Sequence, residues 1–283
     1  MAERSDDDWH RLLTGALLRE RPFPEVNGVA RAADGLWLLL ETERPGLPAE
    51  IGERYGVSVG TRVIGAIAPA AQGGDPVGAG AGSLESGTLG CLVSDAAGTV
   101  YGLTCDHVVG ALASQKISDP IIVPSSRKSG VAPGNTVGSY GKGGTVVLSA
   151  SRPNKVDAAL VTFSAPGSHR SSIHTIGPLA GSTSAISFGD TVEKYGDKSG
   201  HTRGNYAYKV SHLLTYAAGT ALFVDQLGID TTQPPFAETG DSGAIVVDSM
   251  HKAVGLLFAA SATGLGFANP IDDVLSTFGV AVV

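Results

Sequence analysis

The pattern of apolar and polar residues divides the chain into a short mixed segment and a long series of predicted strands. From Thr88 onward, short apolar runs alternate with turns rich in glycine, proline and serine. Runs of this length and spacing are typical of antiparallel sandwiches and barrels. We expect about a dozen strands in two groups of about six: near residues 88–94, 99–105, 119–123, 134–140, 144–149 and 156–163, and near 190–195, 204–216, 221–229, 243–248, 253–260 and 264–268.

The two groups predict a mainly β fold with two antiparallel six-stranded β-barrels. The first barrel covers about residues 88–165, and the second covers about residues 183–270. A short C-terminal helix is expected at about 271–278, because Pro270 stands at its start and Gly279 directly after its end.

Residues 1–72 have a different pattern, which predicts a small α/β module. Three aspartates at 6–8 precede apolar residues at helical spacing, and a second helix is expected at 48–55. The strands expected in this module lie at 26–32, 36–41 and 61–68. The following segment, 73–87, is rich in glycine, and we interpret it as a flexible linker to the strand-rich part at 88–283.

The composition excludes several classes of protein. Lysine and arginine total 20 against 27 aspartates and glutamates, so the net charge is −7. A protein that binds nucleic acid or an anionic membrane needs clustered positive charge instead. Hydrophobic residues make up 42% of the chain, which is enough for a core and excludes a disordered chain.

The N-terminus and the cysteines indicate a cytoplasmic protein. The first residues are acidic and polar, unlike the basic and then apolar start of a secretory signal. No apolar run is long enough to span a membrane. Cys91 and Cys105 are too few for a disulfide framework, and we expect both to be reduced, buried thiols.

The strongest local signal for chemistry is the sequence Gly-Asp-Ser-Gly at 240–243, directly before an apolar run. A serine in a tight glycine turn before a buried strand is well placed to act as a nucleophile. The backbone N–H groups of Gly240 and Ser242 are then positioned to bind the oxyanion of a tetrahedral intermediate. Taken alone, the same residues also suit an ordinary turn.

A serine nucleophile needs a base and a group that orients the base. His107 follows a predicted strand, where a rigid element presents its side chain, although a histidine in apolar surroundings is more often structural. Asp157 opens another apolar run, and a buried carboxylate there needs a partner such as the imidazole N–H of His107. Together, His107, Asp157 and Ser242 predict a catalytic triad between two barrels.

Residues 88–279 resemble the chymotrypsin/trypsin-like serine proteases. Four segments match the landmarks of that superfamily in order: 88–93, 104–108, 156–160 and 240–243. The chain is most similar to bacterial, signal-less members related to the plant narrow-leaf type, which also carry a small N-terminal module. This closer similarity rests on residues 199–204, 225–227, 253–259 and 268–271. Two departures from the pattern are Asp106, where many relatives carry asparagine, and Ala244, where the turn usually continues with glycine.

The resemblance also implies where a substrate side chain binds. The floor of the pocket is expected at residues 235–237 and its walls at 258–260 and 266–268. None of these residues is charged, so we expect an uncharged, apolar residue before the cleaved bond. His201 is implied to border this pocket, with a polar surface role as an open alternative. The substrate-binding residues expected on this basis are Phe236, His201, Phe258, Ala259 and Ala260.

We therefore expect a serine endopeptidase that cleaves protein or peptide substrates through an acyl-enzyme, with no metal or organic cofactor. The alternative is a catalytically silent protease fold that serves as a binding or scaffold module. Two roles are open for the N-terminal module. It either controls access and binds a regulatory partner, or it packs on the protease part and completes its fold.

Overall fold

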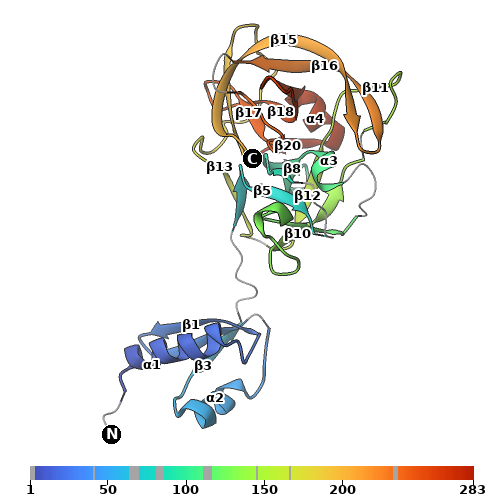
Figure 1. Cartoon of the computed structure of the whole chain (residues 1–283). Coiled ribbons are helices and arrows are strands. Elements are labelled where there is room, and N and C mark those ends of the chain that lie inside the picture. Colours follow the sequence, from blue (N-terminus) through green and yellow to red (C-terminus); the bar gives the residue numbers. More distant parts are fainter. Residues whose placement is uncertain are drawn as a thin grey trace. The chain divides into compact units, whose positions relative to one another are not determined.

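The computed structural model divides the chain into two compact units, Met1–Pro69 and Ala70–Val283 (Figure 1). Among the described residues, no helix is long and apolar enough to cross a membrane. The residues that the structure describes are 4–40, 42–63, 70–80, 86–110, 117–144, 146–165, 167–231 and 235–283.

The first unit is the small α/β module expected from the sequence. Helix α1 (Asp6–Leu13) is capped by Ser5, whose hydroxyl accepts from the backbone N–H of Asp8, and a π-helical turn η1 (Thr14–Arg19) extends it. A second helix, α2 (Leu47–Tyr55), follows the two-stranded hairpin. The sheet has the order β1-β2-β3, with β1 (Val26–Ala32) antiparallel and β3 (Gly60–Val63) parallel to β2 (Gly35–Leu40). The unit encloses its own apolar core.

The interpretation of 73–87 as a flexible linker is wrong for the residues that the structure describes. Strands β4 (Ala71–Gly73), β5 (Pro76–Ala79) and β6 (Gly87–Thr88) belong to the second unit, where β5 pairs with β9 (Pro120–Ile122). Their glycines serve close packing. A Cβ on Gly73 would lie 2.4 Å from the carbonyl oxygen of Gly90, and one on Gly87 would lie 2.5 Å from that of Ser242.

The first large sheet of the second unit has eight strands, in the order β20-β7-β8-β12-β10-β9-β5-β6. It exceeds the expected six strands because β5 and β6 join it from the glycine-rich segment and β20 joins it from the C-terminus. The expected strand at 144–149 does not form in the described residues. Its further strands are β7 (Cys91–Asp95), β8 (Val100–Thr104), β10 (Thr136–Lys142), β12 (Ala159–Phe163) and β20 (Val280–Val282), while β13 (His169–Ile173) pairs with β4.

The second large sheet closes into a six-stranded barrel, as expected. Its order is β11-β16-β15-β14-β17-β18-β19, and β16 also pairs with β19. Strand β11 (Pro153–Asn154) adds a short parallel edge to β16. The barrel strands are β14 (Thr191–Gly196), β15 (Gly200–Tyr216), β16 (Gly219–Asp230), β17 (Ile245–Val247), β18 (Ala253–Ala260) and β19 (Gly266–Pro270).

Hydrogen bonds and the C-terminal segment join the sheets. The carbonyl oxygen of Leu257 in β18 accepts a hydrogen bond from the thiol of Cys105, at the end of β8, and another from the backbone N–H of Gly243. After the second barrel, helix α4 (Ile271–Phe278) leads back to β20, which pairs with β7. One buried apolar cluster therefore contains residues from both sheets.

We predict that the second unit requires residues 70–80. A chain that begins at Ala70 should fold, whereas one that begins at Ser83 loses β4 and β5 and with them the fully buried side chains of Ala71 and Val77. The two truncated chains are compared by thermal unfolding monitored by circular dichroism. Equal melting temperatures would contradict the assignment of this segment to the barrel sheet.

Candidate active site

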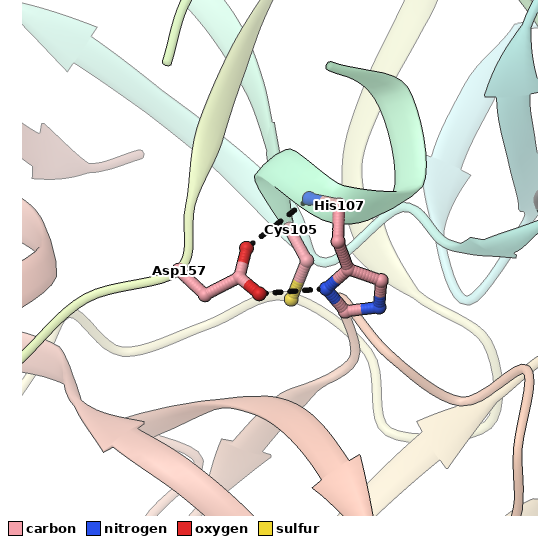
Figure 2. Close-up of side chains that lie close together, drawn as sticks. All are labelled: Cys105, His107 and Asp157. Carbon is pink, nitrogen blue, oxygen red and sulfur yellow. Dashed lines mark hydrogen bonds and ion pairs between the residues drawn. The ribbon is translucent and has the colours of Figure 1, made fainter. Parts of the chain in front are cut away.

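His107 lies on a short helix, α3 (Asp106–Val109), directly after strand β8. Its ring nitrogen Nδ1 lies 2.7 Å from Oδ2 of Asp157, and its backbone N–H donates to Oδ1 of the same carboxylate at 3.2 Å (Figure 2). Both oxygens of one carboxylate therefore hold the residue, and they fix the ring with Nδ1 toward Asp157. This pairing is the one expected from the sequence.

Asp157 is fully buried just before β12 and is held by both barrels. The hydroxyl of Tyr216, at the end of β15, donates to Oδ2 at 2.7 Å, and the backbone N–H of Asp157 donates to Asn269 in β19. Burial alone would raise the pKa of the Asp157 carboxyl. The charge of His107 and the hydrogen bonds from His107 and Tyr216 outweigh burial and hold this pKa below its usual value.

Tyr216 has no counterpart in the sequence-based expectations. It lies near the tip of the long β15–β16 hairpin, and its ring centroid is 5.7 Å from that of His107. Because burial and the Asp157 carboxylate raise the pKa of the Tyr216 hydroxyl, it stays a hydrogen-bond donor. The hairpin length, 17 residues in β15 and 12 in β16, is what brings this tyrosine to the first barrel.

Cys105 lies beside the same pair, and its sulfur, a His107 nitrogen and an Asp157 oxygen all lie within 4.8 Å of one another (Figure 2). A metal site would need a thiolate. Burial and the nearby Asp157 charge instead raise the pKa of the Cys105 thiol well above its usual value, and the thiol donates to Leu257. Burial likewise raises the pKa of Cys91 to about 12. Both cysteines are free and buried, which confirms the expectation of unpaired thiols.

Asp106, the departure noted before His107, is also fully buried. One carboxylate oxygen accepts from the hydroxyl of Tyr140 at 2.8 Å, and the other has no partner among the described residues. Burial, together with the Asp157 charge, raises the pKa of the Asp106 carboxyl. The raised pKa reduces the repulsion between Asp106 and Asp157 at a given pH.

The turn that carries Ser242 has the backbone conformation that its glycines allow. Gly240 has φ 114° and Gly243 has φ 100°, both in the left-handed region. Within the described part of the chain, the N–H groups of Asp241 and Gly243 donate hydrogen bonds, whereas those of Gly240 and Ser242 donate none. The N–H groups of Gly240 and Ser242 are the two that the sequence predicts to bind an oxyanion.

Contacts around Gly87 place the Ser242 turn next to the helix that carries His107. A Cβ on Gly87 would lie 2.5 Å from both the carbonyl oxygen of Ser242 and the side chain of Val108. In this structure the Ser242 hydroxyl donates to the carbonyl oxygen of Phe258 at 3.2 Å.

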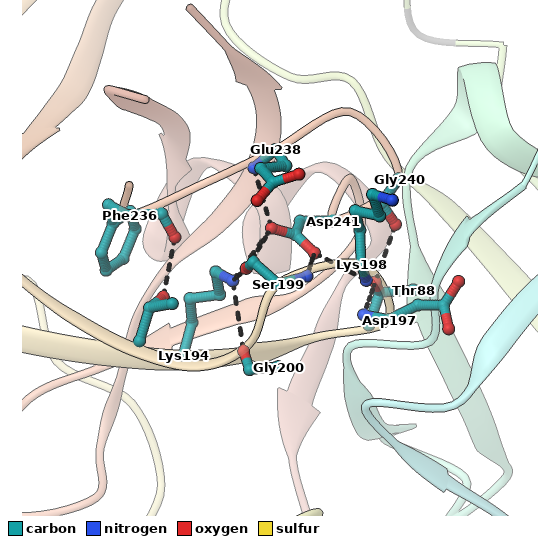
Figure 3. A network of polar contacts seen from close by, with 11 residues as sticks. Thr88, Lys194, Asp197, Lys198, Ser199, Gly200, Phe236, Glu238, Gly240 and Asp241 are labelled. Carbon is teal, nitrogen blue, oxygen red and sulfur yellow. Dashed lines mark hydrogen bonds and ion pairs between the residues drawn. The ribbon is translucent and has the colours of Figure 1, made fainter. Parts of the chain in front are cut away.

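A buried ion pair between Lys194 and Asp241 supports the Ser242 turn (Figure 3). The sequence-based expectations did not include this pair. Asp241 and Lys194, on β14, have fully buried side chains with Nζ 3.0 Å from Oδ2. The Asp241 carboxylate also accepts from the Ser199 hydroxyl and from the backbone N–H groups of Lys198, Ser199 and Glu238. These contacts fix the residue directly before Ser242.

The pKa values of this pair reflect opposing effects. Burial alone would raise the pKa of the Asp241 carboxyl, but the Lys194 charge and the hydrogen bonds outweigh burial and hold it below its usual value. Burial lowers the pKa of the Lys194 ammonium, and the Asp241 charge opposes this shift. Each charge is therefore tolerated in the interior because the other is present.

Some of the expected substrate-binding residues are buried in the second barrel, and others are partly exposed. Phe236 is fully buried in the core of the second barrel, where its ring packs at Gly204 and Gly266, so its side chain is part of the core. Phe258 is also buried, with its ring centroid 4.6 Å from that of Phe223. Ala259 and Ala260 are partly exposed at the end of β18.

The histidine near these aromatic residues is His212, not His201. His201 bonds to Glu193 at 2.9 Å on its own hairpin, which matches the open alternative of a polar surface role. The ring of His212 lies 5.7 Å from that of Phe258 and 4.8 Å from that of Phe267. Burial lowers the pKa of His212, so this imidazole favours the neutral form.

Comparisons with known proteins identify the fold. No protein-family model matches the chain, and no curated protein gives a significant match. The structure of a Nocardiopsis protease is similar over 75% of this chain and 97% of that one, with a TM-score of 0.53 and 18% identity. Protease A of Thermobifida fusca gives the same coverage and TM-score with 19% identity.

A third structure, that of a glutamic acid-specific serine protease that uses a histidine triad in substrate binding, is similar over 75% of this chain and 100% of that one, with a TM-score of 0.54 and 20% identity. At these identities the likeness establishes the fold alone. The second unit therefore has the two-barrel chymotrypsin-like fold, as the sequence resemblance implied. The closer relation to the narrow-leaf type stays a prediction.

We predict that the Lys194–Asp241 pair behaves as a unit. Replacing Lys194→Met leaves a buried carboxylate without its cation and should lower the free energy of unfolding by about 3–5 kcal/mol. The double variant Lys194→Met/Asp241→Asn should recover a large part of that loss, because it removes both buried charges. The free energies are measured by urea unfolding.

The control is Lys209→Met, which removes the cation of an exposed pair with Asp225 and should change stability little. Equal, small losses for Lys194→Met and Lys209→Met would show that the buried pair does not support the turn.

Proposed function

We propose that the chain is a serine endopeptidase in which His107, Asp157 and Ser242 form the catalytic triad. The observation that carries the proposal is the His107–Asp157 pair, which is joined by two hydrogen bonds and lies beside the Ser242 turn. Two backbone N–H groups of that turn donate no hydrogen bond within the described residues. The fold supports the proposal, because the His107–Asp157 pair belongs to one barrel and Ser242 belongs to the neighbouring barrel. The substrates are proteins or peptides.

The proposed reaction begins when the Ser242 hydroxyl attacks a peptide carbonyl carbon. His107 takes the hydroxyl proton at Nε2, and the carbonyl oxygen becomes an oxyanion bound by the N–H groups of Gly240 and Ser242. The proton then passes to the leaving amine, the C–N bond breaks, and an ester to Ser242 remains. Water, activated in the same way, hydrolyses this acyl-enzyme and restores the serine.

Asp157 and Tyr216 have positioning roles in this proposal. Asp157 keeps the proton of neutral His107 on Nδ1, which leaves Nε2 free to act as the base, and it stabilises the imidazolium that forms. The hydrogen bond from Tyr216 keeps the carboxylate charged and oriented in its buried position. No metal or organic cofactor has a step in this mechanism.

The proposed specificity is for an uncharged side chain before the cleaved bond. Ala259, Ala260 and Phe267 are the partly exposed members of the expected pocket walls, and none of them offers a charge to a bound lysine or arginine. A cation buried there without a partner would lose its hydration without compensation.

We predict that the triad residues act as a unit. Ser242→Ala and His107→Ala should each lower kcat for a peptide substrate by roughly 10⁶-fold, and the double variant should lose little more. Ser249→Ala, an exposed serine, is the matched control and should keep full activity. An active Ser242→Ala protein, or losses that add in the double variant, would contradict the assignment.

We propose that the N-terminal module controls access or recognises a partner, because it has a core of its own and none of the proposed catalytic residues. The full chain and a chain that begins at Ala70 are compared on a small peptide ester and on a folded protein substrate. Faster ester cleavage by the shorter chain means that the module inhibits. Loss of protein cleavage alone means that it recognises substrates.

If both activities are the same for the two chains, the module has neither role. A shorter chain that does not fold would instead support the alternative that the module completes the protease fold.

A further inference from the structure

A polar cavity adjoins the proposed oxyanion site. It has a volume of about 230 Å³ and is lined by Ser86, Arg127, Lys128, Asp197, Lys198, Thr239 and Gly240. Gly240 is one of the two residues whose N–H groups are proposed to bind the oxyanion. The cavity is below the range of about 300–1,000 Å³ that holds drug-sized ligands, so its size suits one or two side chains.

The charge of this cavity is the reverse of that of the whole chain. Three cationic side chains line it against the single carboxylate of Asp197, in a chain whose net charge is −7. Lys128 lies 3.3 Å from Asp197 and neutralises it. No ion pair in the described part of the chain involves Lys198, so its ammonium adds net positive charge to the cavity.

Hydrogen bonds fix the turn that carries Lys198 beside Gly240. The backbone N–H of Lys198 donates to Asp241 at 3.0 Å, and that of Asp197 donates to the Thr88 hydroxyl at 3.0 Å. The same hydroxyl donates to the carbonyl oxygen of Gly240 at 3.1 Å. A Cβ on Gly240 would lie 3.2 Å from Cβ of Lys198, so the lysine side chain begins directly at the oxyanion turn.

The position of the cavity indicates which half of a substrate enters it. In Figure 3, Phe236 and Gly240 lie at opposite ends of the Asp241 network, and Asp197, Lys198 and Thr88 cluster at the Gly240 end. The expected pocket walls at Phe258–Ala260 contribute nothing to the cavity lining. If the acyl half of a peptide follows β18, where the expected pocket walls lie, its leaving half passes over Gly240 toward the cavity.

We infer that this cavity is a subsite that selects an acidic side chain within the first residues after the cleaved bond. The inference rests on the proposed endopeptidase function. Lys198 is the specificity-determining residue, because it adjoins the oxyanion turn and is not paired with a carboxylate in the described residues. A carboxylate in the cavity gains a charge-assisted contact that a neutral side chain lacks.

Acyl transfer tests the subsite separately from the acyl half. The full chain is acylated by a small ester with an uncharged, apolar acyl group, and the acyl-enzyme is then partitioned between water and an added dipeptide amide. The dipeptide amides are Ala-Glu-NH₂ and Ala-Gln-NH₂, which differ only in the charge of the second side chain. The readout is the ratio of their transfer efficiencies, which cancels changes in the overall rate.

The unaltered chain should prefer Ala-Glu-NH₂ by about fivefold or more at low salt, and high salt should weaken this preference because it screens the charge. Lys198→Gln should reduce the ratio to within about twofold of unity, and Lys198→Arg should restore most of it. Lys209→Gln, a distant exposed lysine, is the control and should leave the ratio unchanged.

A ratio near unity for the unaltered chain would overturn the subsite while leaving the endopeptidase proposal intact. An equal fall in the ratio for Lys198→Gln and Lys209→Gln would also overturn it, because it would assign the preference to overall charge. If no variant hydrolyses the ester at all, the proposed function itself is wrong and the subsite falls with it.

Discussion

The ion pair between Lys194 and Asp241 is the interaction on which the geometry around Ser242 depends. Asp241 is fully buried, and without a cation its carboxylate would cost too much to ionise in the interior. Lys194 reaches it from the middle of β14, which pairs with β17 in the second barrel. The same carboxylate accepts the N–H groups of Lys198 and Ser199. One buried charge therefore orders the serine turn and the cationic cavity next to it.

A second buried carboxylate, Asp157, links the proposed base to the other barrel. His107 and Asp157 come from the first sheet, but the hydroxyl of Tyr216 and the side chain of Asn269, both from the second sheet, complete the set of contacts to Asp157. The Leu257 carbonyl adds a further link, because it accepts from Cys105 and from Gly243. The proposed triad is thus held by hydrogen bonds that cross between the sheets, and its geometry depends on how the two barrels pack.

The sequence was sufficient to predict the main parts of the fold and the pairing of His107 with Asp157, because these features have local signals. Alternating apolar runs mark the strands, and the turn around Ser242 needs its glycines at φ values that other residues avoid. The segment 73–87 was wrongly interpreted as a flexible linker, because the sequence does not distinguish glycines that permit close strand packing from glycines that permit flexibility. Tyr216 and Lys194 have no local signal, since their roles arise from contacts with residues 59 and 47 positions away. Phe236 was assigned to a pocket from its place in the sequence, which does not indicate whether its side chain is buried.

In the proposed function, Ser242 is an activated nucleophile in the chain as it stands. The most direct test is to treat the purified full chain with a fluorophosphonate, which reacts with activated serines, and to map the adduct by mass spectrometry. We expect a stoichiometric adduct on Ser242 that is absent in His107→Ala. A folded chain that carries no adduct, or an adduct on another serine, would contradict it and would favour a silent protease fold that acts as a binding module.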